Sequence, residues 1–255
     1  MIDRITEQPF CQTRVMCRAV DNLELLLSQP DESVDLIYCD ILYGTGKNFG
    51  DYKDLKPIRS EIESHYLPRL IEMKRVLKST GSIFLQMDNK INHWVRLIMD
   101  DIFGYDNFRN EIIWCYRQGG RSESNYSQKH DTIYWYSKSN SQWIFNGDSV
   151  RIPYEGTGGY QTSGKGVVIN GKVYKPNELG KIPEDWWDIP AIPPMSKERI
   201  GYATQKPKAL IERIIKASSN EGDTVADYYL GSGTTAVVCK ELNRNFIGCD
   251  INPKA

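Results

Sequence analysis

Histidine and paired cysteines are scarce in this 255-residue sequence. It has three histidines and six cysteines, and no two cysteines stand in a Cys-x-x-Cys pair. These numbers argue against the usual zinc-binding patterns, so we expect no metal site. Thiols scattered without a pairing pattern are typical of a reducing compartment rather than of a disulfide-linked secreted protein. We therefore predict a cytoplasmic protein.

Long apolar runs and an excess of one charge are missing as well. No stretch approaches the roughly 20 apolar residues that cross a membrane, and the first residues lack the apolar core of a signal peptide. We therefore expect no membrane partner. The 32 basic and 33 acidic residues leave a net charge of −1. Nucleic-acid-binding domains are usually basic, but a local basic groove can lie on a neutral protein, so this balance does not exclude DNA.

Strand-like and helix-like segments alternate over most of the chain. Short apolar runs predict strands near residues 12–20, 34–39, 82–87, 111–116, 132–136, 224–227 and 245–250. Apolar residues at helical spacing, or a proline or glycine at the start, predict helices near residues 23–27, 60–78, 90–103, 207–218 and 231–242. This alternation indicates an α/β fold with a mostly parallel, twisted sheet and helices on both faces.

The middle of the chain breaks this pattern. Between residues 117 and 200, glycine, serine, tyrosine and lysine dominate, prolines cluster and the periodicity fades. We interpret this region as an irregular insertion without a core of its own. Residues 1–116 and 201–255 then form two halves of one domain.

An aspartate ends one of the predicted strands. Asp40 follows the apolar run Val34–Cys39, and Ile41, Leu42, Tyr43 and a glycine-rich turn come after it. A carboxylate at the end of a buried strand is costly unless a partner or a ligand uses it. For the aspartate alone, a helix cap is the ordinary alternative.

A second unusual segment lies near the C-terminus. Residues 227–235 are Asp-Tyr-Tyr-Leu-Gly-Ser-Gly-Thr-Thr, which predicts a strand end, a tight glycine turn and a helix start. Glycines let the backbone approach a ligand closely, and Asp250, at the end of the next strand, is placed to accept hydrogen bonds from two ribose hydroxyls. The segment lacks G-x-G-x-x-G and the P-loop lysine, so it is not a phosphate cradle. S-adenosylmethionine, with a ribose and no phosphate, fits best, and a purely structural turn is the alternative.

Together and in this order, these segments resemble the amino-group DNA methyltransferases whose catalytic motif precedes the cofactor motif, the beta order. Residues 40–43 stand where that family has Asp-Pro-Pro-Tyr, and residues 227–235 stand at its cofactor loop. Residues 204–207, Thr-Gln-Lys-Pro, and residues 246–253 resemble the motifs on either side of that loop. The resemblance implies a Rossmann-like methyltransferase fold. Its parts would be a catalytic half, a target-recognition insertion and a cofactor-binding half, at residues 1–116, 117–200 and 201–255.

The resemblance also implies roles at the reacting centre. An exocyclic amine is a poor nucleophile because its lone pair is delocalised into the base. The Asp40 carboxylate and the Ile41 carbonyl would accept its two N–H groups and free that lone pair, and Tyr43 would stack on a base flipped out of the duplex. The residues expected to bind the cofactor are Asp21, Asp40, Lys206, Asp227, Tyr228, Gly231, Ser232, Gly233, Thr234, Thr235, Asp250 and Ile251.

The insertion supplies the candidates for DNA binding. Basic residues that can contact phosphates or base edges are Arg117, Arg121, Lys129, Lys165, Lys172 and Lys175. Any one of them is more often a solvated surface charge than a base contact. Tyr126, Tyr154 and Tyr160 are candidates to wedge or stack against bases, or to pack within the insertion itself.

Three functional interpretations stay open at this point. Aspartate at position 40 favours adenine N6, in a specific duplex sequence, over cytosine N4. Ile41 and Leu42 replace two prolines that would fix the loop. The third interpretation is therefore a catalytically weak DNA-binding subunit of a modification system. The resemblance further implies double-stranded DNA as partner, a restriction-modification system with a cognate restriction enzyme or an enzyme acting alone, a homodimer, and a nucleoid-associated place in the cytoplasm.

Overall fold

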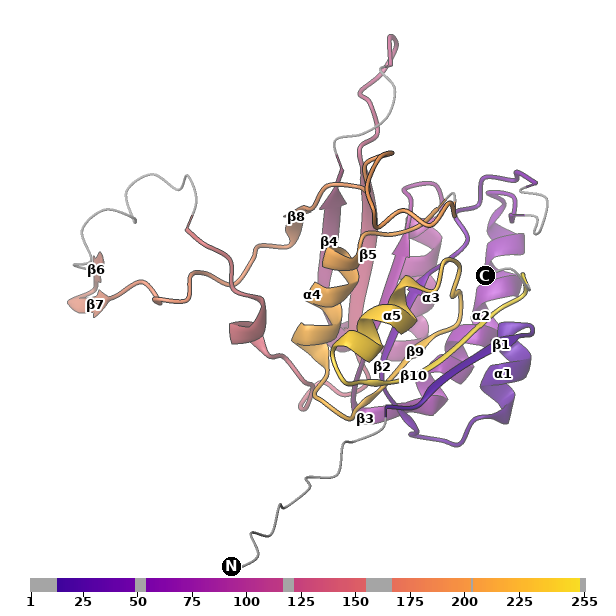
Figure 1. Ribbon diagram of the computed structural model, residues 1–255, viewed down its shortest axis with the longest axis horizontal. Coiled ribbons are helices and arrows are strands. Elements are labelled where there is room, and N and C mark those ends of the chain that lie inside the picture. The colour runs from indigo at the N-terminus through magenta and orange to yellow at the C-terminus, as the bar shows by residue number, and fades with distance from the viewer. Residues whose placement is uncertain (1–12, 49–53, 117–121, 155–166, 203, 253–255) are drawn as a thin grey trace, which may run out of the picture.

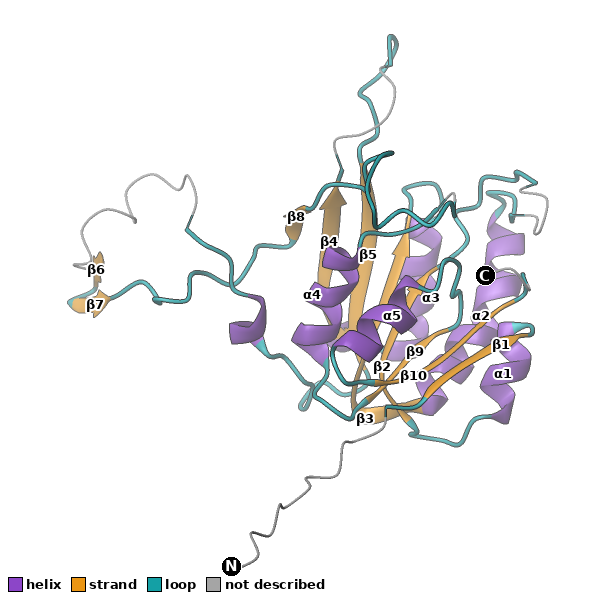
Figure 2. Cartoon of the chain, in the orientation of Figure 1, coloured by secondary structure: helices purple, strands orange, loops and turns teal. Residues whose placement is uncertain are grey.

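The computed structural model describes residues 13–48, 54–116, 122–154, 167–202 and 204–252. Eight strands form one sheet in the order β1-β10-β9-β2-β3-β5-β4-β8, and helices lie on both of its faces (Figure 1, Figure 2). The strands are β1 (Val15–Ala19), β2 (Val34–Asp40), β3 (Leu77–Met87), β4 (Phe108–Cys115), β5 (His130–Ser137), β8 (Trp186–Asp188), β9 (Thr224–Asp227) and β10 (Asn245–Asp250). The helices are α1 (Asn22–Ser28), α2 (Arg59–Val76), α3 (Asn92–Phe103), α4 (Lys208–Ser218) and α5 (Thr234–Glu241), with short 3-10 helices η1 (Tyr105–Asn107) and η2 (Gly147–Val150).

The sheet is parallel around the point where its strand order reverses. β9 and β2 are parallel neighbours, with Leu36 opposite Val225 and Ile37 opposite Ala226. From β2 the chain moves outward to β3, whereas from β9 it moves the other way to β10. In such sheets, ligands bind in the crevice at the carboxyl ends of the strands beside the reversal. The fold therefore brings the loops after β2 and β9 to the same edge of the sheet.

Two apolar clusters hold the helices against the sheet. Along β2, Ile37 and Cys39 pack in the cluster that includes α2 and α3, whereas Leu36 and Tyr38 pack in the cluster that includes α4 and α5. Successive side chains of a strand point to opposite faces. A strand covered on both faces is therefore a nearly continuous apolar run in the sequence, as residues 34–39 are.

The helices follow from their apolar spacing and their end residues. In α3, the buried residues Val95, Ile98, Met99 and Phe103 recur at three- and four-residue intervals, so they form one stripe that faces the sheet. The helix ends at Gly104, whose φ of 92° only glycine adopts without strain. None of the helices in the described ranges combines the length and the apolar character needed to cross a membrane.

The predicted α/β architecture is confirmed. The strands predicted at residues 224–227 and 245–250 have those bounds, and each predicted helix is present to within three residues at its ends. The sequence did not indicate that β5 runs antiparallel to its neighbours β3 and β4. Both β5 and β8 fall within the segment 117–200, yet both are strands of the main sheet. A two-stranded hairpin in the same segment, β6 (Val167–Ile169) and β7 (Lys172–Tyr174), lies apart from that sheet (Figure 1).

Candidate active site

A cavity of about 470 Å³ opens at the carboxyl ends of the parallel strands. Its walls come from the loops after β2, β9 and β10, the start of α1, one face of α2 and the segment before α4. The loop that begins at Asp40 and the bend at Gly231 therefore line one cavity, although 191 positions separate them in the sequence.

Asp40 ends β2 and is the carboxylate in this cavity that lies nearest the reversal of the sheet. Its Oδ2 is ion-paired with Lys206 Nζ, and its Oδ1 accepts a hydrogen bond from the Tyr43 hydroxyl at 2.8 Å. Only 19% of the Asp40 side chain and 12% of the Lys206 side chain are exposed, so water screens the pair weakly. Burial raises the pKa of the Asp40 carboxyl, and the Lys206 ammonium opposes that rise. Lys206 thus favours the ionised, hydrogen-bond-accepting form of Asp40.

The two aliphatic residues after Asp40 are held by hydrogen bonds. Ile41 is buried, and its N–H donates to the Gln86 carbonyl at 3.0 Å. The Leu42 carbonyl accepts a hydrogen bond from the Tyr66 hydroxyl of α2 at 2.9 Å. These contacts from β3 and α2 fix the backbone of the loop on both sides.

Tyr43 stands between two carboxylates. Its hydroxyl oxygen lies 2.8 Å from Asp40 Oδ1 and 2.6 Å from Asp131 Oδ2. The ammonium of Lys206 lies 5.2 Å from the centroid of its ring, within the range of a cation–π contact. The ring of Tyr43 is therefore tied to both charges of the Asp40–Lys206 pair.

The bend after β9 fixes two further carboxylates. Asp227 is buried and accepts hydrogen bonds from the Tyr229 N–H at 3.0 Å and the Thr235 hydroxyl at 2.7 Å. Burial raises its pKa to about 7. Gly231, with a left-handed φ of 53°, donates its N–H to Asp250 Oδ2 at 2.8 Å. The bend thereby holds the Asp250 carboxylate against the glycine turn.

Comparison with known sequences gives the family. The sequence model of a family described as DNA methylase, the N6/N4 methyltransferases, matches residues 34–255. The chain belongs to this family of DNA methylases.

Several characterised DNA methylases are similar over most of this chain. Type II methyltransferase M.HpaI of Haemophilus parainfluenzae is 37% identical over 244 residues, which are 94% of this chain and 70% of the relative. DNA adenine methyltransferase YhdJ of Escherichia coli (strain K12) is 32% identical over 236 residues, 91% of this chain and 76% of the relative. Type II methyltransferase M1.MboII of Moraxella bovis is 44% identical over 154 residues, 57% of this chain and 58% of the relative.

Solved structures of DNA methylases share the fold. The cytosine-N4-specific PvuII DNA methyltransferase matches with a TM-score of 0.67 at 19% identity, over 94% of this chain and 84% of that one. M1.HpyAVI in complex with S-adenosylmethionine matches with a TM-score of 0.60 at 21% identity, over 94% of this chain and 95% of that one. This likeness establishes the predicted Rossmann-like methyltransferase fold.

DNA methylases of this family take their methyl group from S-adenosylmethionine, and the cavity suits a nucleoside of that kind. Its volume falls in the range of small-molecule sites. Asp250 accepts one backbone N–H on each oxygen, from Gly231 at 2.8 Å and from Asn252 at 2.8 Å. Each carboxylate oxygen has a further lone pair, so the fixed group retains two acceptors for a pair of ribose hydroxyls.

One face of α2 closes the cavity, although no residue of this helix was predicted as a site residue from the sequence. Arg69 donates to Asp21 at 2.9 Å and to the Asn22 side chain at 2.5 Å, so it ties α2 to the start of α1. His65 Nε2 lies 3.0 Å from the Tyr229 hydroxyl. Burial lowers the pKa of His65 to about 4, so its ring is neutral at pH 7. Ten of the 18 residues of α2 are Arg, Lys, Glu, Ser or His, so the sequence carried no signal that sets His65 and Arg69 apart from the other polar residues of this helix.

The predicted site residues divide into two groups by position. Those that line the cavity are Asp21, Asp40, Ile41, Tyr43, Lys206, Tyr228, Gly231, Asp250 and Ile251. Those that lie in and around the bend without lining it are Asp227, Ser232, Gly233, Thr234 and Thr235. In the second group, the Asp227–Thr235 hydrogen bond closes the bend onto the first turn of α5.

The predicted DNA-binding residues are spread over the insertion. Those outside the described residues are Arg117, Arg121, Tyr160 and Lys165. Lys129 lies at the base of the β4–β5 hairpin, where its carbonyl accepts the Tyr116 N–H at 2.9 Å, and Lys172 begins β7. Tyr126, on the loop of the β4–β5 hairpin, is 99% exposed.

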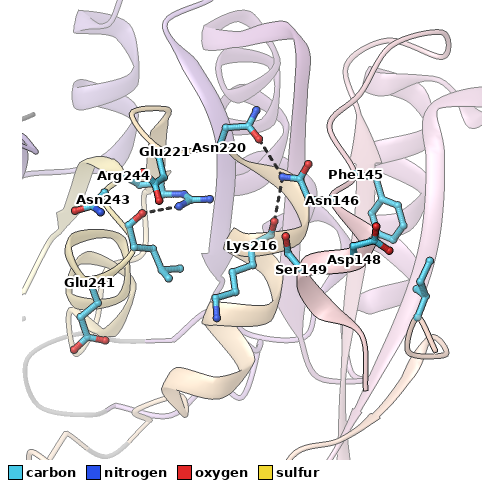
Figure 3. A pocket seen from close by; sticks show the side chains of 13 residues that line it. Phe145, Asn146, Asp148, Ser149, Lys216, Asn220, Glu221, Glu241, Asn243 and Arg244 are labelled. Carbon is cyan, nitrogen blue, oxygen red and sulfur yellow. Dashed lines mark hydrogen bonds between the residues drawn. The ribbon is translucent and has the colours of Figure 1, made fainter. Parts of the chain in front are cut away.

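A larger hollow of about 990 Å³ lies elsewhere and does not belong to this site. It is bordered by the turns that precede β9 and β10, so it opens at the edge of the sheet opposite Asp40. Figure 3 shows the amide of Asn146 between Asn220 and Lys216, with which it makes hydrogen bonds. Arg244 donates to the carbonyls of Leu242 and Ser219. These polar groups serve to anchor loops to one another.

Proposed function

We propose that this DNA methylase transfers the methyl group of S-adenosylmethionine to adenine N6 within a specific duplex sequence. The observation that carries the proposal is that Asp40, paired with Lys206, shares one cavity with the Asp250 side of the glycine bend. Amine methylation needs an acceptor for the amine and a holder for the methyl donor at one place. The order of the motifs, residues 40–43 before 227–235, supports a place in the beta order.

The side chains around Asp40 suit the activation of an exocyclic amine. S-adenosylmethionine, when bound, supplies an electrophilic methyl group. Asp40 accepts one N–H of the adenine amine and the Ile41 carbonyl accepts the other, which concentrates the lone pair on the nitrogen. Tyr43, three residues along the same loop, offers its ring to the flipped base. Lys206 opposes the rise that burial causes in the pKa of Asp40 and so favours the ionised form, which accepts the amine N–H.

The replacement of the two motif prolines by Ile41 and Leu42 is compatible with activity. Proline would restrict φ and remove an N–H donor. Here the Ile41 N–H is used by the Gln86 carbonyl, and the Tyr66 hydroxyl holds the Leu42 carbonyl. The hydrogen bonds restrain the loop where proline rings would otherwise do so. This argues against the alternative of a catalytically weak DNA-binding subunit.

The choice of adenine over cytosine rests on two supports. The residue at the acceptor position is aspartate, and a relative whose name specifies adenine is 32% identical over 91% of this chain. The structural neighbour whose name specifies cytosine N4 is only 19% identical. A likeness at this level supports the shared fold but does not indicate which base is methylated. Methylation of cytosine N4 is the alternative.

Analysis of the product tests the proposal. The protein is incubated with S-adenosylmethionine and duplex DNA of mixed sequence, and the DNA is digested to nucleosides for mass spectrometry. We expect N6-methyladenine from the wild type and none from Asp40→Ala, which keeps its affinity for the cofactor by calorimetry. N4-methylcytosine would establish the alternative base. Cofactor binding without either product would establish the non-catalytic subunit.

Partners are inferred on the same basis. Two of the similar proteins are named type II methyltransferases, so we propose a restriction-modification setting, and target recognition by the segment within residues 117–200 that lies outside the main sheet. Sequencing of modified positions in DNA from cells that express the protein gives the target sequence. Light scattering of the purified protein tests the expected homodimer.

A further inference from the structure

A second carboxylate lies behind the catalytic loop, and the proposed chemistry has not used it. Asp131 is the second residue of β5, the strand between β3 and β4, and only 3% of it is exposed. A carboxylate buried to this degree is costly unless hydrogen bonds offset the loss of water. Its partners therefore indicate its role.

Three neighbouring strands and loops supply those partners. Asp131 Oδ2 accepts hydrogen bonds from the Tyr43 hydroxyl at 2.6 Å and from Gln86 Nε2 at 2.9 Å. Its Oδ1 accepts a longer one from the Tyr116 hydroxyl at 3.3 Å. Gln86 is itself oriented, because its Oε1 accepts the Tyr38 hydroxyl at 2.8 Å. The amide of Gln86 therefore presents its N–H face to Asp131.

The contact with Tyr43 couples Asp131 to Asp40. A phenol has one proton and can donate it to one acceptor at a time, yet the Tyr43 oxygen is within hydrogen-bond distance of both carboxylates, 2.8 Å from Asp40 and 2.6 Å from Asp131. The two acids therefore compete for one proton. When Tyr43 donates to Asp131, the Oδ1 of Asp40 is released to accept another donor.

We propose that Asp131 is a positioning residue for methyl transfer: it draws the Tyr43 hydroxyl away from Asp40, which frees an Asp40 oxygen for the amine of the target base and fixes the Tyr43 ring. Asp131 touches neither base nor cofactor in this scheme and acts through Tyr43. The inference rests on the proposed role of Asp40 as the amine acceptor.

A double-mutant cycle tests whether Asp131 acts through the Tyr43 hydroxyl. Asp131→Asn keeps the shape but offers a weaker, neutral acceptor, so the Tyr43 proton turns to Asp40. We expect kcat to fall by about 10-fold, equivalent to ~1.4 kcal/mol in the barrier, with the KM for the cofactor unchanged. In the Tyr43→Phe background, which lacks the shared proton, Asp131→Asn should have no further effect.

A matched control removes a nearby carboxylate that does not contact Tyr43. Asp88 follows β3 and pairs with Lys90 at 2.5 Å, so Asp88→Asn removes one negative charge close to Asp131 and leaves the Tyr43 contact in place. Its kcat should remain within about twofold of the wild type. An equal loss of kcat from Asp131→Asn with and without the Tyr43 hydroxyl would overturn the proposal, because it would assign Asp131 a purely structural role.

Urea unfolding of the same variants repeats the cycle without activity. Asp131→Asn should shift the unfolding midpoint more in the wild type than in Tyr43→Phe, because in that background only the contacts of Asp131 with Gln86 and Tyr116 are left to weaken. Equal shifts in both backgrounds would contradict the shared hydrogen bond. A protein that makes no methylated base but shows the coupling in urea would overturn the proposed function and sustain the Asp131–Tyr43 contact, so the two failures are distinguishable.

Discussion

At the scale of single residues, two of the carboxylates that line the cavity are paired with cations. Asp40 is ion-paired with Lys206, and Asp21 is ion-paired with Arg69 of α2. Pairing offsets much of the cost of placing each charge where water is scarce. His65, which also lines the cavity, is neutral instead, because burial and the nearby Arg69 charge lower its pKa to about 4. A neutral imidazole beside Tyr229 adds no charge to a site meant for a cationic methyl donor.

The lowered pKa of His65 makes stability depend on pH. Between pH 6.5 and about pH 4, the unfolded chain binds a proton at this residue and the folded chain does not, so acid favours unfolding. The contribution is fully present above pH 6.5 and is lost as pH falls towards about 4. The difference between the unfolded and folded pKa values of His65 corresponds to at most about 3 kcal/mol of unfolding free energy. The partial exposure of the ring makes the actual contribution smaller.

Urea unfolding at pH 7 and pH 5 measures this dependence. Wild type should lose more unfolding free energy on acidification than His65→Gln, which has no proton to bind. His93→Gln is the matched control, since His93 is exposed on α3, and it should behave as the wild type does. An identical loss in wild type and His65→Gln would show that the pKa of His65 is the same in the folded and unfolded states.

At the scale of elements, the sequence predicted what local patterns encode. β9 and β10 were predicted with their observed bounds because each is an apolar run between a turn and a terminal aspartate. The direction of β5 was not predicted, because an apolar run such as Thr132–Tyr136 has the same pattern whether the strand is parallel or antiparallel to its neighbours. That direction matters for the site, since it carries Asp131 to the edge where β2 ends and turns the β4–β5 loop towards that edge.

The β4–β5 loop carries an exposed aromatic side chain at the edge of the sheet where the cavity opens. Tyr126 is 99% exposed on this loop, and the base of the hairpin is linked to the catalytic loop through Asp131 and Tyr43. Proteins that deform the duplex often insert a side chain between base steps, and we predict that Tyr126 does so while the target base is extruded. Tyr126→Ala should lower kcat on a paired target by about 10-fold, the equivalent of one stacked base.

A mispaired target base provides the decisive comparison for Tyr126. A mismatch is cheaper to extrude, so it should restore most of the activity that Tyr126→Ala loses. Tyr105→Ala is the control, because Tyr105 is 73% exposed in η1, at the opposite edge of the sheet. If the mismatch gives no rescue, Tyr126 contributes to binding or folding and not to extrusion.

At the scale of the whole molecule, the site is assembled from segments far apart in the sequence. Asp21, Asp40, His65, Lys206 and Asp250 come from five separate segments and meet only when the sheet is complete. Sequence reasoning found those at strand ends, where a buried run stops at an acid. It missed His65 and Arg69 on α2, and Asp131 on β5, because a polar residue within a helix or strand looks the same whether it faces solvent or a cavity.

Because unfolding separates these segments, a ligand that bridges them must stabilise the fold. S-adenosylmethionine at 100 times its dissociation constant should add about 2.7 kcal/mol to the free energy of unfolding. Asp250→Ala removes the acceptors for its ribose, so most of that gain should disappear. Asp40→Ala removes the acceptor for the target amine; although Asp40 lines the same cavity and was also expected to contact the cofactor, the variant keeps the ribose acceptors of Asp250 and should retain most of the gain. Thermal unfolding with and without cofactor measures both variants, and equal losses in the two would mean that Asp40 and Asp250 serve the same ligand, contrary to the division of roles proposed for the cavity.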